Sequence, residues 1–150
     1  MNRKIVAIVQ ARYNSVRLPG KVLKNINGTP AIECLYKRLS KSKYLDDIII
    51  ATSKDKKNLP LINFLKKKKF NFYVGENDNV LKRFFDTASK YKADIIVRIT
   101  GDSIILGYSL LDKMLKEFLK KKVDFLCNTQ PMTYPDGQDI EIFSFKSLKK

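Results

Sequence analysis

Short apolar runs alternate along this chain with longer segments in which apolar residues recur every three or four positions. Runs rich in Ile and Val are typical of buried strands, and the longer spacing is typical of helices packed on a sheet. Their alternation predicts a layered α/β domain. The expected strands cover residues 4–9, 47–52, 71–74, 94–99 and 124–128, with a further one at 138–143.

Four helices are expected between these strands. The first starts with Thr29 as its N-cap and Pro30 in its first position, which suits proline because that backbone N–H is unpaired anyway. The second covers residues 59–69, and the fourth starts after a Ser109 cap with Asp112 behind it. The third turns one apolar face inward, made of Val80, Leu81, Phe84, Phe85, Ala88 and Tyr91.

Polar loops follow three of the expected strands. In an open α/β sheet, ligands gather outside the carboxyl ends of the strands. The segment 10–21 follows the first strand, Thr52 and Ser53 end the second, and Thr100, Gly101 and Asp102 follow the run at 94–99. We therefore expect these three loops to meet in one crevice.

The first loop carries Arg12, Arg17 and Lys21, with Gly20 before the lysine. Guanidinium groups hold phosphate oxygens in pairs, a lysine adds a mobile positive charge, and loop amides can complete an anion site. This combination predicts a polyanion site, with a nucleoside triphosphate as the expected ligand. A solvated basic loop is the alternative interpretation.

Two familiar phosphate loops are excluded by inspection. A Walker A loop needs GxxxxGK followed by Ser or Thr, whereas Ser15 stands in the first glycine position and Val22 follows the lysine. A dinucleotide fingerprint needs GxGxxG directly after the strand, and no glycine precedes Gly20. A different phosphate-binding fold is indicated.

Asp102 is the first candidate for a metal ligand. A triphosphate carries about four negative charges, and its reaction needs a hard divalent cation held by carboxylate and phosphate oxygens. Gly101 would allow a close approach of the ion and phosphate to the backbone. On the dipeptide alone, an aspartate in an ordinary Gly-Asp turn is the competing interpretation.

Two arginines stand in unusual places. Arg98 interrupts a run that would be apolar on both faces of a central strand, so its charge must meet a carboxylate, a nucleotide or solvent; a structural ion pair is the first hypothesis. Arg83 lies beside inward-facing phenylalanines in the third helix, where it is a weaker candidate or simply a solvated side chain.

The motif AxxNSxRLPGKVL at 11–23 resembles the opening of the cytidylyltransferases that activate acidic sugars. The spore coat polysaccharide biosynthesis protein F group resembles this chain more closely than the 3-deoxy-manno-octulosonate cytidylyltransferase group does. The resemblance continues in family order through IIIATS at 48–53, NVLKRF at 79–84, IIVRITGD at 95–102, and NT with TYPDGQDIEIFSF between 128 and 145. Several motifs in register are far more specific than one.

This resemblance implies a three-layer Rossmann-like nucleotide-diphospho-sugar transferase fold with a mostly parallel sheet. It also implies transfer of CMP from CTP to a sugar or sugar acid for surface polysaccharide synthesis, with Mg²⁺ as the cofactor and a homodimer as a possible assembly. The implied residues are Arg12, Lys21 and Asp102 for catalysis, with Asp102 on the metal; Gln10, Ala11, Arg12, Arg17, Lys21 and Thr52 for the nucleotide; and Tyr134, Asp136, Asp139 and Glu141 for the acceptor.

The chain departs from this family in two respects. Ser103 to Gly107 replace the x-Pro that usually follows the Gly-Asp pair. The related enzymes are also longer, so the domain at 1–150 is expected to be a single one that is shortened at its C-terminus. A length of 150 residues suits one domain, and no stretch approaches the about 20 apolar residues of a membrane span, so a cytoplasmic protein is expected.

Composition adds an alternative. The chain has 30 Lys and Arg against 15 Asp and Glu, a net charge of +15, with no histidine and two distant cysteines, which argues against zinc and disulfide sites. The surplus is mostly lysine near expected helix ends, and no aromatic platform accompanies it, so no specific nucleic-acid surface is expected. A catalytically incomplete nucleotide- or sugar-binding module and a basic polyanion-binding protein stay open as other functions.

Overall fold

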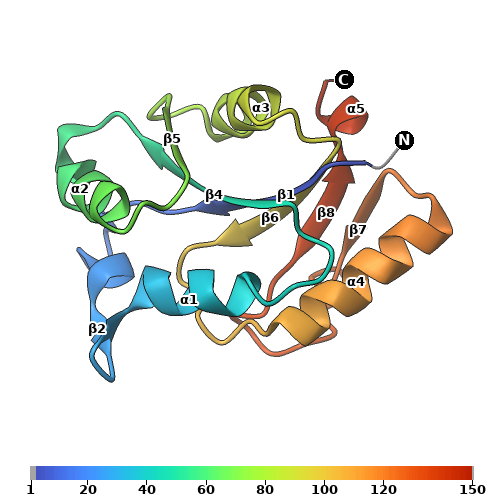
Figure 1. Cartoon of the computed structure of the whole chain (residues 1–150), viewed down its shortest axis with the longest axis horizontal. Coiled ribbons are helices and arrows are strands. Elements are labelled where there is room, and N and C mark those ends of the chain that lie inside the picture. The colour runs from blue at the N-terminus through green and yellow to red at the C-terminus, as the bar shows by residue number, and fades with distance from the viewer. Residues whose placement is uncertain (1–2, 150) are drawn as a thin grey trace.

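The main feature of the computed structural model, which describes residues 3–149, is a six-stranded sheet with the strand order β5-β4-β1-β6-β8-β7 (Figure 1). The first four strands in this order are parallel, and β8 runs antiparallel to both its neighbours. The prediction of a mostly parallel α/β sheet is confirmed. The strands are β1 (Ile5–Gln10), β4 (Asp47–Ser53), β5 (Phe72–Gly75), β6 (Ile95–Thr100), β7 (Phe125–Cys127) and β8 (Glu141–Ser144).

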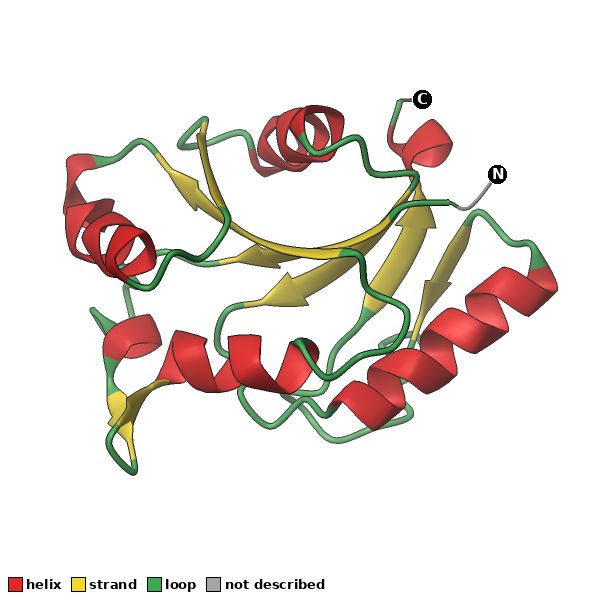
Figure 2. Cartoon of the chain, in the orientation of Figure 1, coloured by secondary structure: helices red, strands yellow, loops and turns green. Residues whose placement is uncertain are grey.

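Helices cover both faces of this sheet, which gives three layers (Figure 2). Helices α1 and α4 lie on one side, and α3 and α5 lie on the other (Figure 1). A small antiparallel ribbon of β2 (Asn25–Ile26) and β3 (Thr29–Pro30) precedes α1. The helices are η1 (Lys21–Leu23), α1 (Ala31–Leu39), η2 (Lys56–Asn58), α2 (Leu59–Lys67), α3 (Val80–Lys90), α4 (Tyr108–Lys121) and α5 (Phe145–Leu148).

Strand β1 is apolar on both faces because it lies between β4 and β6 with a helix layer on either side. Ala7 and Val9 join the core under α1 and α4, whereas Val6 and Ile8 join the core under α3. Its register places Gln10 beside Ala51 of β4 and Thr100 of β6. The carboxyl ends of these strands therefore meet at one edge of the sheet, as the sequence predicted.

The two faces are covered unequally. The core beneath α1, α2 and α4 is much the larger of the two clusters. On the other face, α3 packs on β5, β4 and β1, while β8 is contacted by the short α5. This leaves the face of the sheet near β8 and β7 less thickly covered than the rest.

Three local predictions need correction. Helix α1 starts at Ala31 with Pro30 as its N-cap, because Thr29 pairs with Ile26 across the turn made by Asn27 and Gly28. Asn27 and Gly28 both have positive φ, 48° and 82°, as a two-residue hairpin turn requires.

Helix α4 starts at Tyr108, one residue before the predicted cap Ser109. Its N-cap is Gly107, and Ser109 lies inside the first turn. Leu81, predicted to face inward, is 67% exposed, and its neighbour Arg83 is fully buried instead. The apolar face of α3 is therefore rotated away from Leu81.

None of the helices within residues 3–149 is both long enough and apolar enough to cross a membrane.

We expect Leu35→Ala to lower the free energy of unfolding by about 2–5 kcal/mol, because it leaves a cavity in the larger core. Leu35 is fully buried in α1. Urea denaturation measures the change, with Leu59→Ala as the control, since Leu59 is 52% exposed and its loss should cost less than about 0.5 kcal/mol. Equal losses for the two variants would contradict this packing.

Candidate active site

A cavity of about 350 Å³ opens at the carboxyl ends of β1 and β6. Its walls come from the end of β1, the loop after it, the start of η1 and the turn after β6. The lining residues are Gln10, Ala11, Arg12, Ser15, Lys21, Val22, Arg98, Thr100, Gly101 and Asp102. Two of the three predicted loops thus converge here.

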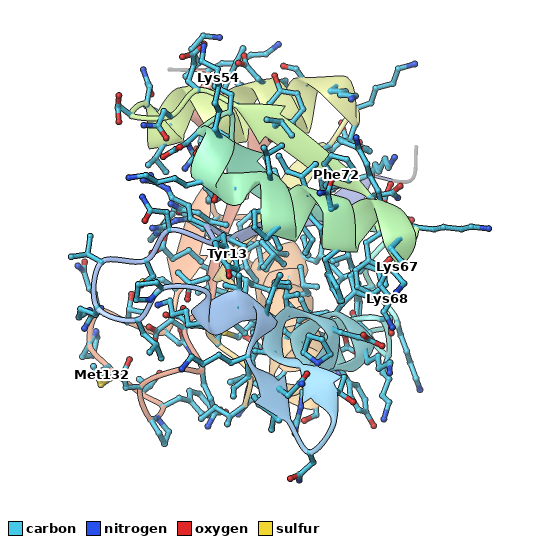
Figure 3. The ribbon with its side chains drawn as sticks, turned by 90° about the vertical axis from the view of Figure 1, so that its left-hand side faces the viewer. Tyr13, Lys54, Lys67, Lys68, Phe72 and Met132 are labelled. Atoms are coloured by element: carbon cyan, nitrogen blue, oxygen red, sulfur yellow. The ribbon has the colours of Figure 1, made fainter. Side chains whose placement is uncertain are left out.

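The loop after β1 is held in place by backbone contacts centred on Tyr13. The carbonyl of Tyr13 accepts hydrogen bonds from the backbone N–H of Gly20 at 2.8 Å and of Ser15 at 3.0 Å. Its own N–H donates to Asn58 Oδ1 at 2.8 Å, which ties the loop to η2. Figure 3 shows Tyr13 between η1 and α2.

Gly20 is required at its position for two reasons. Its φ is 71°, in the left-handed region, and a Cβ there would lie 3.2 Å from the Tyr13 ring. Gly20 also immediately precedes η1, so this turn fixes where Lys21 begins the next element. Arg12 and Lys21 consequently face one cavity from the two ends of the loop.

Lys21 and Asp102 form an ion pair through Nζ and Oδ2. Partial burial raises the pKa of Asp102, but hydrogen bonds from Lys21 and Thr100, with the Lys21 charge, outweigh it and hold this pKa below its ordinary value of 3.8. The Asp102 side chain is still 48% exposed. A charged carboxylate beside a cation is therefore accessible in the cavity at neutral pH.

Gly101 brings the turn after β6 against the end of β1. Its N–H donates to the Gln10 carbonyl at 2.8 Å, and a Cβ at this position would lie 2.8 Å from Ala11 Cβ. A larger residue would push the two strand ends apart. The glycine thus sets the distance between Asp102 and the first loop.

The predicted nucleotide-binding residues divide into two groups. Gln10, Ala11, Arg12 and Lys21 line the cavity together with Asp102. Arg17 lies on the exposed part of the loop and does not line it. Thr52 is fully buried on the same face of β4 as Ile50, its hydroxyl has no partner within residues 3–149, and it does not line the cavity.

The four predicted acceptor residues do not form one cluster. Tyr134 packs on the α4 side, where its hydroxyl accepts a hydrogen bond from Lys113 at 3.2 Å. Glu141 lies on the opposite face and pairs with Arg98 at 2.5 Å between Nη1 and Oε1, so the ion pair predicted for Arg98 is present. Asp136 closes an exposed turn by accepting a hydrogen bond from the Gly137 N–H, and Asp139 precedes β8, whose first residue is Glu141. Glu141 alone of the four adjoins the cavity, through Arg98.

Arg83 is the residue whose importance the sequence analysis underestimated. It is fully buried, its Nη1 donates to the carbonyls of Glu76 and Asn77, and its Nε and Nη2 have no partner within residues 3–149. Burial, and then the charge of Arg12, lower its pKa. A buried guanidinium with two unused donors is costly to the fold, although Arg83 does not itself line the cavity.

A signal for Arg83 was present in the helical spacing. Counting three to four residues from Val80 and back from Thr87 places position 83 on the buried face of α3. Gly75, at the end of β5, makes room for it, since a Cβ there would lie 2.9 Å from Arg83 Cγ. A charged residue at an inward position of a helix indicates a buried charge that needs a partner, as Arg98 does in its strand.

The cavity offers a divalent cation one protein ligand with a charge, the carboxylate of Asp102. Among the lining residues, Asp102 is the one carboxylate, and nowhere within residues 3–149 do three or more His, Cys, Asp or Glu side chains gather to hold a metal. One exposed carboxylate beside a phosphate-sized cavity suits an ion that takes its other ligands from phosphate oxygens and water. The chain by itself would hold such an ion weakly.

Comparison with known proteins identifies the family. Residues 6–150 match the family model described as cytidylyltransferase. The chain belongs to the cytidylyltransferase family. The match includes every residue that lines the cavity, so the site described above lies within the part that defines the family.

Three curated relatives are similar to this chain. The chain is 37% identical over 147 residues to the uncharacterized protein MJ1063 of Methanocaldococcus jannaschii, covering 98% of this chain and 59% of that protein. It is 32% identical to the spore coat polysaccharide biosynthesis protein SpsF of Bacillus subtilis, covering 81% and 52% of the two chains. It is 34% identical to a 3-deoxy-manno-octulosonate cytidylyltransferase of Fusobacterium nucleatum, covering 79% and 48%. The resemblance to both groups is confirmed.

A solved cytidylyltransferase from Leptospira borgpetersenii has the same fold, with a TM-score of 0.92 and 32% identity. The match includes 98% of this cytidylyltransferase-family chain and 63% of the Leptospira protein. The curated relatives are matched over about half to three fifths of their lengths. The family is therefore established for a chain much shorter than those relatives.

Replacing Lys21 with Met should raise the pKa of Asp102, because the burial that opposes ionisation stays while the cation is removed. We expect the Asp102 carboxyl carbon to titrate below pH 3.8 in the original chain and at a higher pH in Lys21→Met, by NMR. A carboxyl with a depressed folded pKa stabilises the fold above its unfolded pKa, and this contribution is lost as pH falls below about 4. An unchanged midpoint in the variant would show that Lys21 does not control Asp102.

Proposed function

We propose that this chain is a CTP-dependent cytidylyltransferase that transfers CMP to a sugar or sugar acid and releases pyrophosphate. The observation that carries the proposal is the cavity in which Arg12, Lys21 and Asp102 meet. Family membership and relatives named for CMP transfer to 3-deoxy-manno-octulosonate and for spore coat polysaccharide synthesis support it. We expect the product to serve surface polysaccharide synthesis from the cytoplasm, where CTP is available.

The reaction is an in-line displacement. An acceptor hydroxyl oxygen attacks the α-phosphorus of CTP, and the new O–P bond forms as the bond from that phosphorus to the α–β bridging oxygen breaks. The bridging oxygen takes the electron pair, pyrophosphate leaves, and the hydroxyl proton passes to solvent. Catalysis of this kind depends on positioning and on neutralising the charge of the phosphates.

Arg12 and Lys21 supply that neutralisation. Arg12 binds phosphate oxygens with its planar fork of donors. Lys21 has three N–H donors, so it can keep its ion pair with Asp102 and also donate to a phosphate oxygen. Backbone groups at Gln10 and Ala11 contact the cytosine or ribose at the end of β1. Arg83 is fully buried and does not line the cavity, but the charge of Arg12 acts on it, and we propose that its two unused nitrogens reach hydrogen-bond acceptors of the bound nucleotide.

Asp102 is the residue that would hold a divalent cation, which we take to be Mg²⁺, on the phosphates. Such an ion, when bound, neutralises phosphate charge and favours departure of pyrophosphate. Because the cavity offers one carboxylate, cation binding should be weak without nucleotide and strong with it.

Thermal unfolding with CTP, UTP, ATP and GTP, each with and without Mg²⁺, tests the proposal directly. A ligand that binds only the folded state stabilises it by about 2.7 kcal/mol at about 100 times its Kd. At about 2–4 °C per kcal/mol for a chain of this size, that predicts a rise in Tm of about 5–10 °C, largest with CTP and Mg²⁺. Asp102→Ala should lose the Mg²⁺-dependent part, and Lys21→Ala most of the shift.

Pyrophosphate release separates catalysis from binding. A CTP-dependent shift without release in the presence of 3-deoxy-manno-octulosonate or another acidic sugar would favour the incomplete binding module, a candidate because the chain matches only part of its relatives' lengths. Equal shifts with every nucleotide that vanish at high salt would instead favour a basic polyanion-binding protein, given the net charge of +15.

Arg83→Met should raise the Kd for CTP about tenfold or more, since hydrogen bonds from a charged donor contribute about 1.5–3 kcal/mol. Methionine fills a similar buried volume, so the fold should survive. Lys82→Met is the matched control, because its neighbour Lys82 is exposed and pairs with Asp86 on the surface of α3. Isothermal titration measures both values, and an unchanged Kd in Arg83→Met would make this arginine purely structural.

A further inference from the structure

The side chain of Asn58 is buried in η2, and both ends of its amide form hydrogen bonds. Its Oδ1 accepts from the Tyr13 backbone N–H at 2.8 Å. Its Nδ2 donates to Ser53 Oγ at 2.8 Å and to the Ser53 carbonyl at 3.2 Å. One side chain therefore joins the end of β4 to the loop that follows β1.

Asn58 stands at a helix-capping position but does not cap the helix. It precedes α2 as the N-cap, where the side chain of an asparagine usually accepts a hydrogen bond from the first turn. No such bond forms within residues 3–149, and Pro60 in that turn has no N–H to offer. The capping preference of asparagine thus does not explain this residue, whereas its hydrogen bonds with Tyr13 and Ser53 do.

The backbone on both sides of Arg12 is tied to β4 and to the segment after it. The N–H of Ala11 donates to the Ala51 carbonyl at 3.0 Å, and the N–H of Tyr13 donates to Asn58. The first tie is made by the backbone alone, but the second depends on one side chain. No other side chain within residues 3–149 hydrogen-bonds to the backbone of this loop. Asn58 therefore fixes the backbone next to Arg12.

Tyr13 is also connected to the other end of the loop. Its carbonyl accepts a hydrogen bond from the Gly20 N–H at 2.8 Å, and Lys21 comes directly after Gly20 at the start of η1. A displacement of Tyr13 would therefore move Arg12 and Lys21 together. These are the two cations of the loop that line the cavity.

We propose that Asn58 is a positioning residue of the nucleotide site, which holds the loop after β1 in the shape that its cations need to bind the triphosphate. This inference rests on the proposed function. Asn58 does not line the cavity, so it acts through Tyr13. The end of β4 gains a role as well, because Ser53 holds Asn58 from outside the cavity. A misplacement of about 1 Å caused far from the reacting atoms can lower the rate of an enzyme about 100-fold.

Asn58→Leu tests this role, because leucine has a similar volume but forms none of these hydrogen bonds. We expect the Kd for CTP with Mg²⁺ to rise about tenfold. Inorganic triphosphate should lose affinity by the same factor, since the displaced side chains bind phosphates. Isothermal titration measures both values. Asn58→Ala, which leaves room for water beside the Tyr13 N–H, is the second variant in case leucine prevents folding, and it should also weaken both ligands.

Asn128→Leu is the matched control. Asn128 is also buried, and its amide likewise joins two backbone groups, donating to the Gln138 carbonyl and accepting from the Ile140 N–H, each at 2.8 Å. It does not line the phosphate cavity. This variant should lose stability in urea denaturation but keep both Kd values within about twofold of the original.

Amide hydrogen exchange, followed by NMR, measures the same role without a ligand. The Gly20 N–H keeps its own acceptor in Asn58→Leu, so faster exchange there reports a loosened loop. Asn128→Leu corrects for a general loss of stability. We expect a larger increase of the Gly20 exchange rate in Asn58→Leu than in Asn128→Leu.

Two results would overturn the role of Asn58. The first is an unchanged Kd for both ligands in a folded variant at this position. The second is an equal rise in Kd, or an equal change in Gly20 exchange, in Asn58→Leu and Asn128→Leu, which would assign the effect to stability alone. Failure of the original chain to bind CTP would overturn the proposed nucleotide site instead, and Gly20 exchange would still show whether Asn58 holds the loop.

Discussion

The close contact between the ends of β1 and β6 is the constraint on which the rest of the site depends. Gly101 donates to the Gln10 carbonyl and leaves no room for a side chain against Ala11. Strand β1 cannot move to relieve this contact, because it is fully buried between two parallel neighbours. Asp102 is therefore fixed at a distance from the first loop that Lys21 can span, and the cation and carboxylate pair across it.

The surroundings of Asp102 and Arg83 determine how each of these charges is stabilised. Asp102 remains accessible and its pKa is lowered chiefly by hydrogen bonds, so it keeps its charge without losing contact with solvent. Arg83 is enclosed and donates to two backbone carbonyls, but two of its nitrogens have no partner within residues 3–149. A buried cation with unused donors is costly unless a ligand completes it. The cavity itself is lined by three cations, Arg12, Lys21 and Arg98, and by one carboxylate, Asp102.

The sequence predicted the strands and the first loop well because each depends on local information. The Ile and Val runs predict β1, β4 and β6, and parallel strands necessarily bring Gln10, Lys21 and Asp102 to one edge. The burial of Thr52 and Arg83 depends on which face of an element points inward, which only packing decides. Tyr134 and Glu141 were grouped because they are close in sequence. The structure places Tyr134 on the α4 side of the sheet and Glu141 on the opposite face, because the chain crosses from one face to the other in the residues that separate them. Spacing alone cannot show such a crossing.

The two faces of the sheet are covered unequally. Helices α1, α2 and α4 cover one face with a large core. On the other face, α3 covers β5, β4 and β1, and a second cavity, of about 440 Å³, lies between the start of α3 and strands β7 and β8, with Arg98 in its lining. Arg98 stands at this boundary, in a strand whose other inward residues are apolar. A charge at that position is explained if it serves both cavities, because an arginine that only paired with Glu141 could be replaced, together with its partner, by two apolar residues at little cost in stability.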